Sequence, residues 1–178
     1  MRCAAHTFNL VASMDLGKGL LKHMGFVVTA FIALNKKAYG KAQALFNTQR
    51  RSPHISDTIE KALDRRLVVL GKTRWNALYD SIILFNNILA TKKTEFERFL
   101  NCMENLSAFN DQEIVFLKEW AKVMSHVAIA LDTIHVENTY LGTLLPTVAI
   151  TIMKLRNMRK SLAIHKPLVD ALVAAINT

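Results

Sequence analysis

The sequence is poor in cysteine, glycine and proline: among its 178 residues there are two, six and three of them. Two cysteines, Cys3 and Cys102, cannot form a disulfide scaffold or a four-cysteine zinc site. So few glycines and prolines argue against a turn-dense all-β fold. The longest apolar run, residues 24–34, is shorter than the roughly 18 residues of a membrane-spanning helix, so we interpret it as a buried helix.

Acidic residues are scarce in the first half of the chain. Residues 1–76 carry 13 Lys+Arg against 4 Asp+Glu, a net charge of +9, whereas residues 77–178 carry 10 of each. Between Arg2 and Arg51 the only acid is Asp15. Charge alone favours two interpretations equally: a contact with a polyanion on this half, or a solvated basic face.

The hydrophobic residues that are present, 51% of the chain, mostly recur at helical spacing. We therefore expect a mainly α fold. Residues 36–49 form a basic amphipathic stretch with apolar residues on one side, which Pro53 ends. The clearest helical pattern is a row of apolar residues at three- and four-residue spacing from Ile114 to Leu131, which we name the apolar rail. The only strand candidate is residues 67–70.

Five sites carry signals for the start of a helix. Asp57, Thr94 and Asn110 each precede a Glu by three positions, the spacing of a capping box. Pro146 and Pro167 suit the first turn of the helices that follow them.

Residues that could carry chemistry are few. Cys3 and His6 could share one helix face, but no second ligand pair completes a zinc site, so a packed Cys and a hydrogen-bonded His are the default interpretation. The sequence also lacks a carboxylate cluster of the kind that holds two catalytic metal ions, and it lacks a phosphate-binding glycine loop. We expect no catalysis from this chain alone.

Residues 72–76, Lys-Thr-Arg-Trp-Asn, join a basic loop to a helix. Structurally, Thr73 is a helix cap and Trp75 a core anchor. Functionally, Arg74 can clamp a phosphate and Trp75 can stack on an unpaired base. Spacing alone favours the structural interpretation.

Two segments resemble one family. Residues 2–11, RCAAHTFNLV, are similar to the RCxxHxLNL segment of hAT-superfamily transposases (the hobo/Activator type, including BED-finger relatives). Residues 72–80, KTRWNALYD, are similar to their TRWNSxYD segment. The region Leu117–Trp120 and residues 140–146 resemble later parts of the same proteins, so the resemblance spans most of the chain.

The resemblance implies a ribonuclease H-like core that is interrupted by a large helical insertion domain. Residues 1–15 would end the first core segment, and residues 16–178 would form the all-helical insertion domain, truncated at both ends. The family's three metal-binding acids would fall outside residues 1–178, and Asp15 matches none of them. No cofactor is therefore expected here, and Mg²⁺ is expected only in the full-length family enzyme.

The resemblance also implies a nuclear protein with residual, sequence-tolerant DNA binding. It places Cys3 and His6 near the cut phosphate and Trp75 on a flipped base. We add the basic residues of the first half as phosphate contacts, which gives the predicted DNA-binding set of Cys3, His6, Lys36, Lys37, Lys41, Arg50, Arg51, Lys72, Arg74 and Trp75.

Two alternatives stay open. The chain could be a helical protein-interaction or self-association module, carried by the neutral half. Surplus apolar residues would then be former core surfaces, namely Phe26, Phe31, Ile32, Val148 and Ile152. It could also be a fragment of a transposase without a function of its own. Neither a membrane nor a small-molecule substrate is expected.

Overall fold

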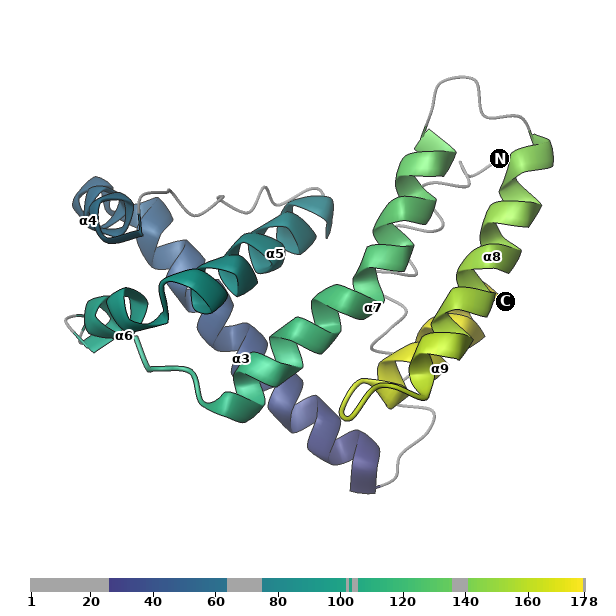
Figure 1. Cartoon of the computed structure of the whole chain (residues 1–178), viewed down its shortest axis with the longest axis horizontal. Coiled ribbons are helices and arrows are strands. Elements are labelled where there is room, and N and C mark those ends of the chain that lie inside the picture. Colours follow the sequence, from purple (N-terminus) through teal and green to yellow (C-terminus); the bar gives the residue numbers. More distant parts are fainter. Residues whose placement is uncertain (1–25, 64–74, 102, 104–105, 136–140, 178) are drawn as a thin grey trace. The chain divides into compact units, whose positions relative to one another are not determined.

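The computed structural model describes residues 26–63, 75–101, 103, 106–135 and 141–177. These residues are helical apart from short joints, and they contain no strand, so the mainly α prediction is confirmed. The helices in Figure 1 are α3 (Phe26–Arg51), α4 (Pro53–Leu63), α5 (Trp75–Thr91), α6 (Lys93–Asn101), α7 (Asp111–His135), α8 (Leu141–Arg159) and α9 (Lys166–Ile176). The strand candidate at 67–70 and residues 1–15, predicted to end the first core segment, lie outside the described residues.

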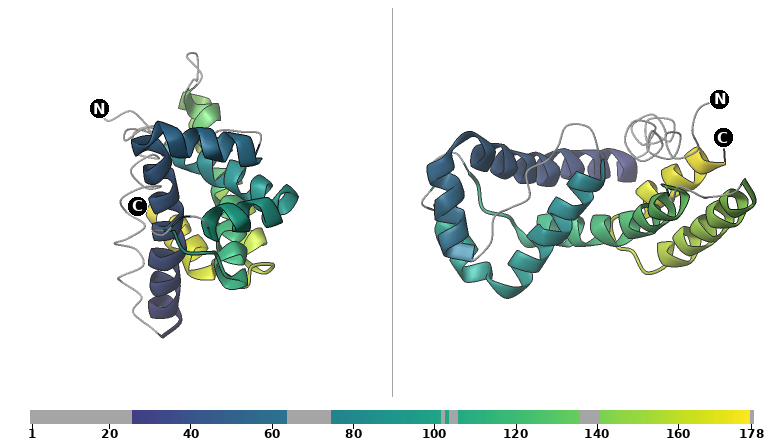
Figure 2. Two further views of the ribbon diagram at one scale, coloured as in Figure 1. Left: turned by 90° about the vertical axis from the view of Figure 1, so that its left-hand side faces the viewer. Right: turned by 90° about the horizontal axis from the view of Figure 1, so that it is seen from above.

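The chain forms two compact units. We name residues 33–121 the central unit, and residues 1–32 with 122–178 the terminal unit. Within the central unit, α6 packs against both α4 and α5. Within the terminal unit, α8 and α9 form a helical hairpin, which the different views of Figures 1 and 2 both show.

The Asn110 capping box is confirmed. The Glu113 N–H donates to the Asn110 side-chain oxygen at 2.8 Å, and the Asn110 N–H donates to the Glu113 carboxylate at 2.9 Å. This reciprocal pair satisfies two amide groups that a helix start leaves free. It fixes the beginning of α7 at Asp111.

Two other predicted helix starts are wrong. Asp57 lies inside α4, because that helix begins four residues earlier, at Pro53. The Ser52 hydroxyl accepts the Ile55 N–H at 3.3 Å, and Pro53 occupies the first turn, where no N–H is needed. Thr94 lies inside α6, which already begins at Lys93.

The prolines later in the chain behave differently from one another. Pro167 stands in the first turn of α9, as predicted. Pro146 was expected in a first turn but lies inside α8, which begins five residues earlier at Leu141. The helix loses only one backbone bond there, the one that an N–H at position 146 would donate to the Gly142 carbonyl.

The core of the central unit is an aromatic cluster around Phe85. Its ring centroid lies 4.9 Å from that of Phe109, 5.4 Å from that of Phe96 and 6.5 Å from that of Phe46. Phe85 is fully buried. These rings come from α3, α5, α6 and the joint before α7, so the cluster ties four segments together.

The predicted apolar rail of α7 is confirmed, since Ile114, Leu117, Ala121, Met124, Ala128 and Leu131 are all buried. In the terminal unit, Phe31 packs edge-on against His165 at 5.2 Å between centroids. Phe31 is thus a core residue and not a surplus one. Val148 and Ile152 are half-buried, and the side chain of Phe26 lies outside the described part.

Gly40 weakens α3 without a packing reason. It is exposed in the middle of the helix, and a methyl group added there meets nothing within 4 Å. Because glycine loses more backbone freedom than alanine on folding, Gly40→Ala is expected to raise the free energy of unfolding by about 0.5–1 kcal/mol. Urea unfolding checks this value. The matched reverse change, Ala44→Gly on the same exposed face, should lower the free energy of unfolding by a similar amount. If both variants are as stable as the wild type, glycine does not weaken α3.

Candidate nucleic-acid interface

The exposed face of α3 carries four cations and no acid. Lys36 and Lys37 lie near the middle of the helix, and Arg50 and Arg51 lie in its last turn. The two pairs stand about 21 Å apart along the axis, at about 1.5 Å per residue. We name this face the basic stripe, defined by these four residues and the exposed residues between them: Gly40, Gln43, Ala44 and Asn47.

The stripe faces solvent because the other side of α3 is apolar. Ala42, Leu45 and Phe46 are buried, as the sequence pattern predicted, and Ala38 is buried with them. Tyr39 lies beside them, and burial raises the pKa of its phenol. Packing of this side fixes the rotation of the helix, and so fixes which cations point outward.

The residues between the two cationic pairs are short and uncharged. Gly40 and Ala44 leave the backbone open to close approach, and Gln43 and Asn47 offer amides that both donate and accept hydrogen bonds. An α-helix of this kind fits the major groove of B-DNA, which is about 12 Å wide. The sequence prediction missed these four residues, although the helical spacing of the apolar side would have located them.

The position of Arg50 and Arg51 also has a purely structural interpretation. Cations in the last turn of a helix interact favourably with its dipole. Lys36 and Lys37 have no such role, because they lie far from either end of α3. The two pairs together therefore indicate a binding surface more strongly than the arginines alone.

Lys41, predicted as a phosphate contact, holds the fold together. Its ammonium group donates to the Glu113 carboxylate at 2.9 Å and to the Ala108 carbonyl at 2.8 Å, and it lies 5.8 Å from the centre of the Phe109 ring. The side chain of Glu113 is fully buried. A phosphate would have to compete with this buried carboxylate, so Lys41 is not part of the basic stripe.

The remaining predicted site residues are not placed. Cys3, His6, Lys72 and Arg74 lie outside the described residues. Trp75 is the first residue of α5, but its side chain also lies outside the described part. The structure thus brings Lys36, Lys37, Arg50 and Arg51 together on one helix face and leaves the other members of the set as predictions.

Metal-binding groups do not gather in the described ranges: no three His, Cys, Asp or Glu side chains there could hold an ion together. The described helices also include none that is long and apolar enough to cross a membrane.

His126 gives the terminal unit a pH-dependent stability. Burial lowers the pKa of its imidazole below 6.5, and the nearby Lys154 and Lys122 lower it further. In the unfolded chain this imidazole takes up a proton as the pH falls through about 6.5, whereas in the folded chain it stays neutral to lower pH. The terminal unit therefore loses stability as the pH falls from about 6.5 to the pKa of the folded state. Melting temperatures at about pH 7.5 and pH 5 should differ more for the wild type than for His126→Gln. Equal differences would count against this assignment.

No protein-family model matches the chain, and no curated protein or solved structure matches it either. The interpretation of the basic stripe therefore depends on its own geometry and charge.

Proposed function

We propose that this protein binds duplex DNA with little sequence preference through the basic stripe of α3. The observation that carries the proposal is the outward alignment of Lys36, Lys37, Arg50 and Arg51 on one acid-free helix. Phosphate contacts by lysine and arginine supply most of non-specific DNA affinity, because they release condensed counterions.

In this mechanism α3 lies against the major groove. Its two cationic pairs contact phosphates at separate points along the duplex, and the short residues between them let the backbone approach the groove. Gln43 and Asn47 can hydrogen-bond to base edges or to bound water. Two amides give a weak preference at most, so binding tolerates many sequences.

The resemblance to hAT transposases supports the same conclusion from a different direction. A chain derived from the helical insertion domain of such a transposase would contact DNA in the nucleus. In that account Arg74 and Trp75 would add a phosphate clamp and a base-stacking group.

A charge-removal pair tests the proposal. Arg50→Gln/Arg51→Gln is expected to weaken binding to a short duplex roughly tenfold at moderate salt, because two phosphate contacts are lost. Fluorescence anisotropy measures the affinity. The matched control is Arg98→Gln/Lys118→Gln, which removes two exposed cations of the central unit that lie off the stripe. If both pairs weaken binding equally, the stripe is not the binding surface.

A further inference from the structure

The outer side of α8 is an apolar stripe with no partner among the described residues. Leu145 is 75% exposed, and Ala149, one turn further along, is also exposed. The opposite side of the same helix is packed, since Thr151 and Leu155 are buried. A helix that is apolar on both sides is usually enclosed on both sides, so the exposed side has the character of a contact surface.

The spacing of this stripe is that of a coiled-coil seam. Its members alternate between steps of three and four residues: Gly142, Leu145, Ala149, Ile152 and Arg156. Four of them are exposed and Ile152 is half-buried. This alternation keeps one line of side chains facing a second helix over two heptads. Two of its members are small, and at Gly142 an added methyl group meets nothing within 4 Å, so a neighbouring backbone can come close.

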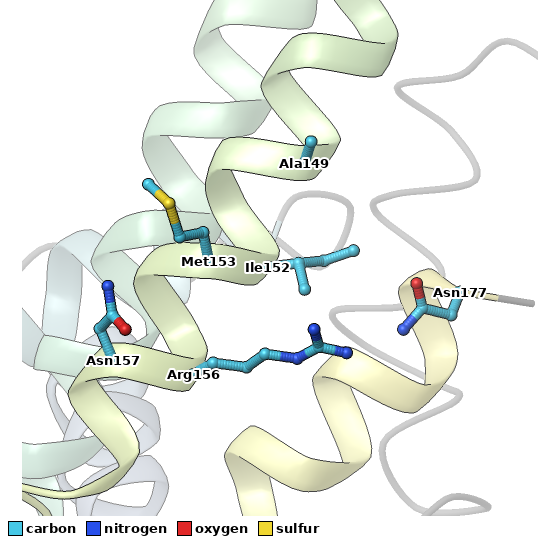
Figure 3. A pocket seen from close by; sticks show the side chains of 6 residues that line it. All are labelled: Ala149, Ile152, Met153, Arg156, Asn157 and Asn177. Atoms are coloured by element: carbon cyan, nitrogen blue, oxygen red, sulfur yellow. The ribbon is translucent and has the colours of Figure 1, made fainter.

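The lower part of the seam is hollowed. A cavity of about 370 Å³ lies beside Ala149, Ile152 and Arg156 and reaches Asn177 at the end of α9. Figure 3 shows Ile152 and Arg156 extending from α8 on the side that faces Asn177. An apolar side chain could therefore enter beside Ile152 with an anionic group near the Arg156 guanidinium.

The charge around the seam selects the occupant. Lys154, Arg156 and Arg159 stand on α8, Lys160 follows directly, and α8 contains no acid. Of these, Arg159 is engaged by Asp170 of α9 in a two-bond ion pair at 2.7 and 2.9 Å. Lys154 lies off the seam, near His126 of α7. Arg156 and Lys160 are exposed at the C-terminal end of the seam, and a helix bearing carboxylates there would complement them.

Two other occupants fit less well. A second copy of α8 would bring cations against the same acid-free helix in either orientation, without a carboxylate to pair with them. A DNA phosphate backbone would meet Leu145, Ala149 and Ile152 along most of the seam, and these side chains offer it no hydrogen bond.

We propose that the α8 seam is a docking site for an acidic amphipathic helix of a partner protein. The partner's apolar residues pack along Leu145, Ala149 and Ile152, and its carboxylates pair with Arg156 and Lys160. This surface lies in the terminal unit and does not depend on DNA binding by the central unit.

A synthetic peptide tests this with the full-length chain. The probe is a helix of three heptads with leucine at the seam positions and glutamate at the flanking positions, and the comparison peptide carries lysine at those flanking positions. The glutamate peptide is expected to bind at least about tenfold more tightly in fluorescence anisotropy. Leu145→Ser should reduce its affinity about tenfold, and Arg156→Glu should reverse the preference between the two peptides.

Ile150→Ser is the matched control, because Ile150 is 47% exposed on the same helix but lies off the seam. Leu145 is 75% exposed and Ile150 nearly half exposed, so both variants are expected to fold, and circular dichroism checks this. Equal binding of the two peptides, no binding of either, or equal loss with Ile150→Ser overturns the proposal. It is also overturned if the glutamate peptide is displaced by duplex DNA, or if sedimentation shows self-association that Leu145→Ser abolishes.

Discussion

Phe85→Ala is expected to lower the free energy of unfolding by about 4 kcal/mol, the range for removing a fully buried aromatic ring. The Phe85 ring is wholly inaccessible and contacts rings from three other segments at centroid distances of 4.9 to 6.5 Å. Its removal leaves a cavity at the point where α3, α5 and α6 meet, and it also removes the edge-on ring contacts.

Urea unfolding followed by circular dichroism measures this loss. Phe85→Leu, which keeps most of the apolar volume, should lower the free energy of unfolding by only about 1.5 kcal/mol. Val115→Ala is the matched surface control, because Val115 is 42% exposed in the same unit; it should change stability by about 0.5 kcal/mol or less. A loss below about 1 kcal/mol for Phe85→Ala would show that the aromatic cluster is not the core of the central unit.

Glu113→Ala has the second largest expected effect, a loss of about 3 kcal/mol. Glu113 has two structural roles, since its carboxylate accepts the Asn110 N–H at the start of α7 and the Lys41 ammonium from α3. Its removal leaves the ammonium of Lys41, whose side chain is only 22% exposed, without its ion-pair partner. It also deletes half of the capping box.

A double-mutant cycle with Lys41→Met separates the two roles. If the ion pair stabilises the fold, the double variant Lys41→Met/Glu113→Ala should lose less free energy of unfolding than the two single variants lose together. The difference, the coupling energy, should be about 1 kcal/mol or more. Strict additivity would mean that Glu113 stabilises the fold through the cap alone. Because Lys41 lies outside the basic stripe, these variants should retain DNA affinity as long as they are folded.

The helical architecture could be predicted where local patterns and packing agree. The predictions of the Asn110 capping box and of the apolar rail of α7 were correct, because each depends on residues that lie within a few positions of one another in the sequence. Asp57 and Thr94 have the same capping spacing, but both lie inside their helices. The helix α4 begins after Ser52, and α6 begins at Lys93. A capping box also fits inside a helix, so its spacing alone does not determine where the helix starts.

The candidate surfaces could be predicted only in part. The outward direction of Lys36 and Lys37 follows from the apolar spacing of the same helix. The role of Lys41 does not, because its partner Glu113 lies 72 positions away in the sequence. The seam of α8 was missed because Pro146 suggested a later helix start, which removed Gly142 and Leu145 from the helix.

The salt dependence of DNA binding tests the central claim most directly. If the basic stripe makes four phosphate contacts, the slope of log affinity against log salt is negative, and Lys36→Gln/Lys37→Gln/Arg50→Gln/Arg51→Gln should reduce its magnitude by about 3.6 relative to the wild type. A control that removes four exposed cations elsewhere, Lys61, Arg98, Lys118 and Lys122, should leave the slope unchanged. An unchanged slope in the stripe variant, or an equal decrease in the control, would contradict DNA binding by α3.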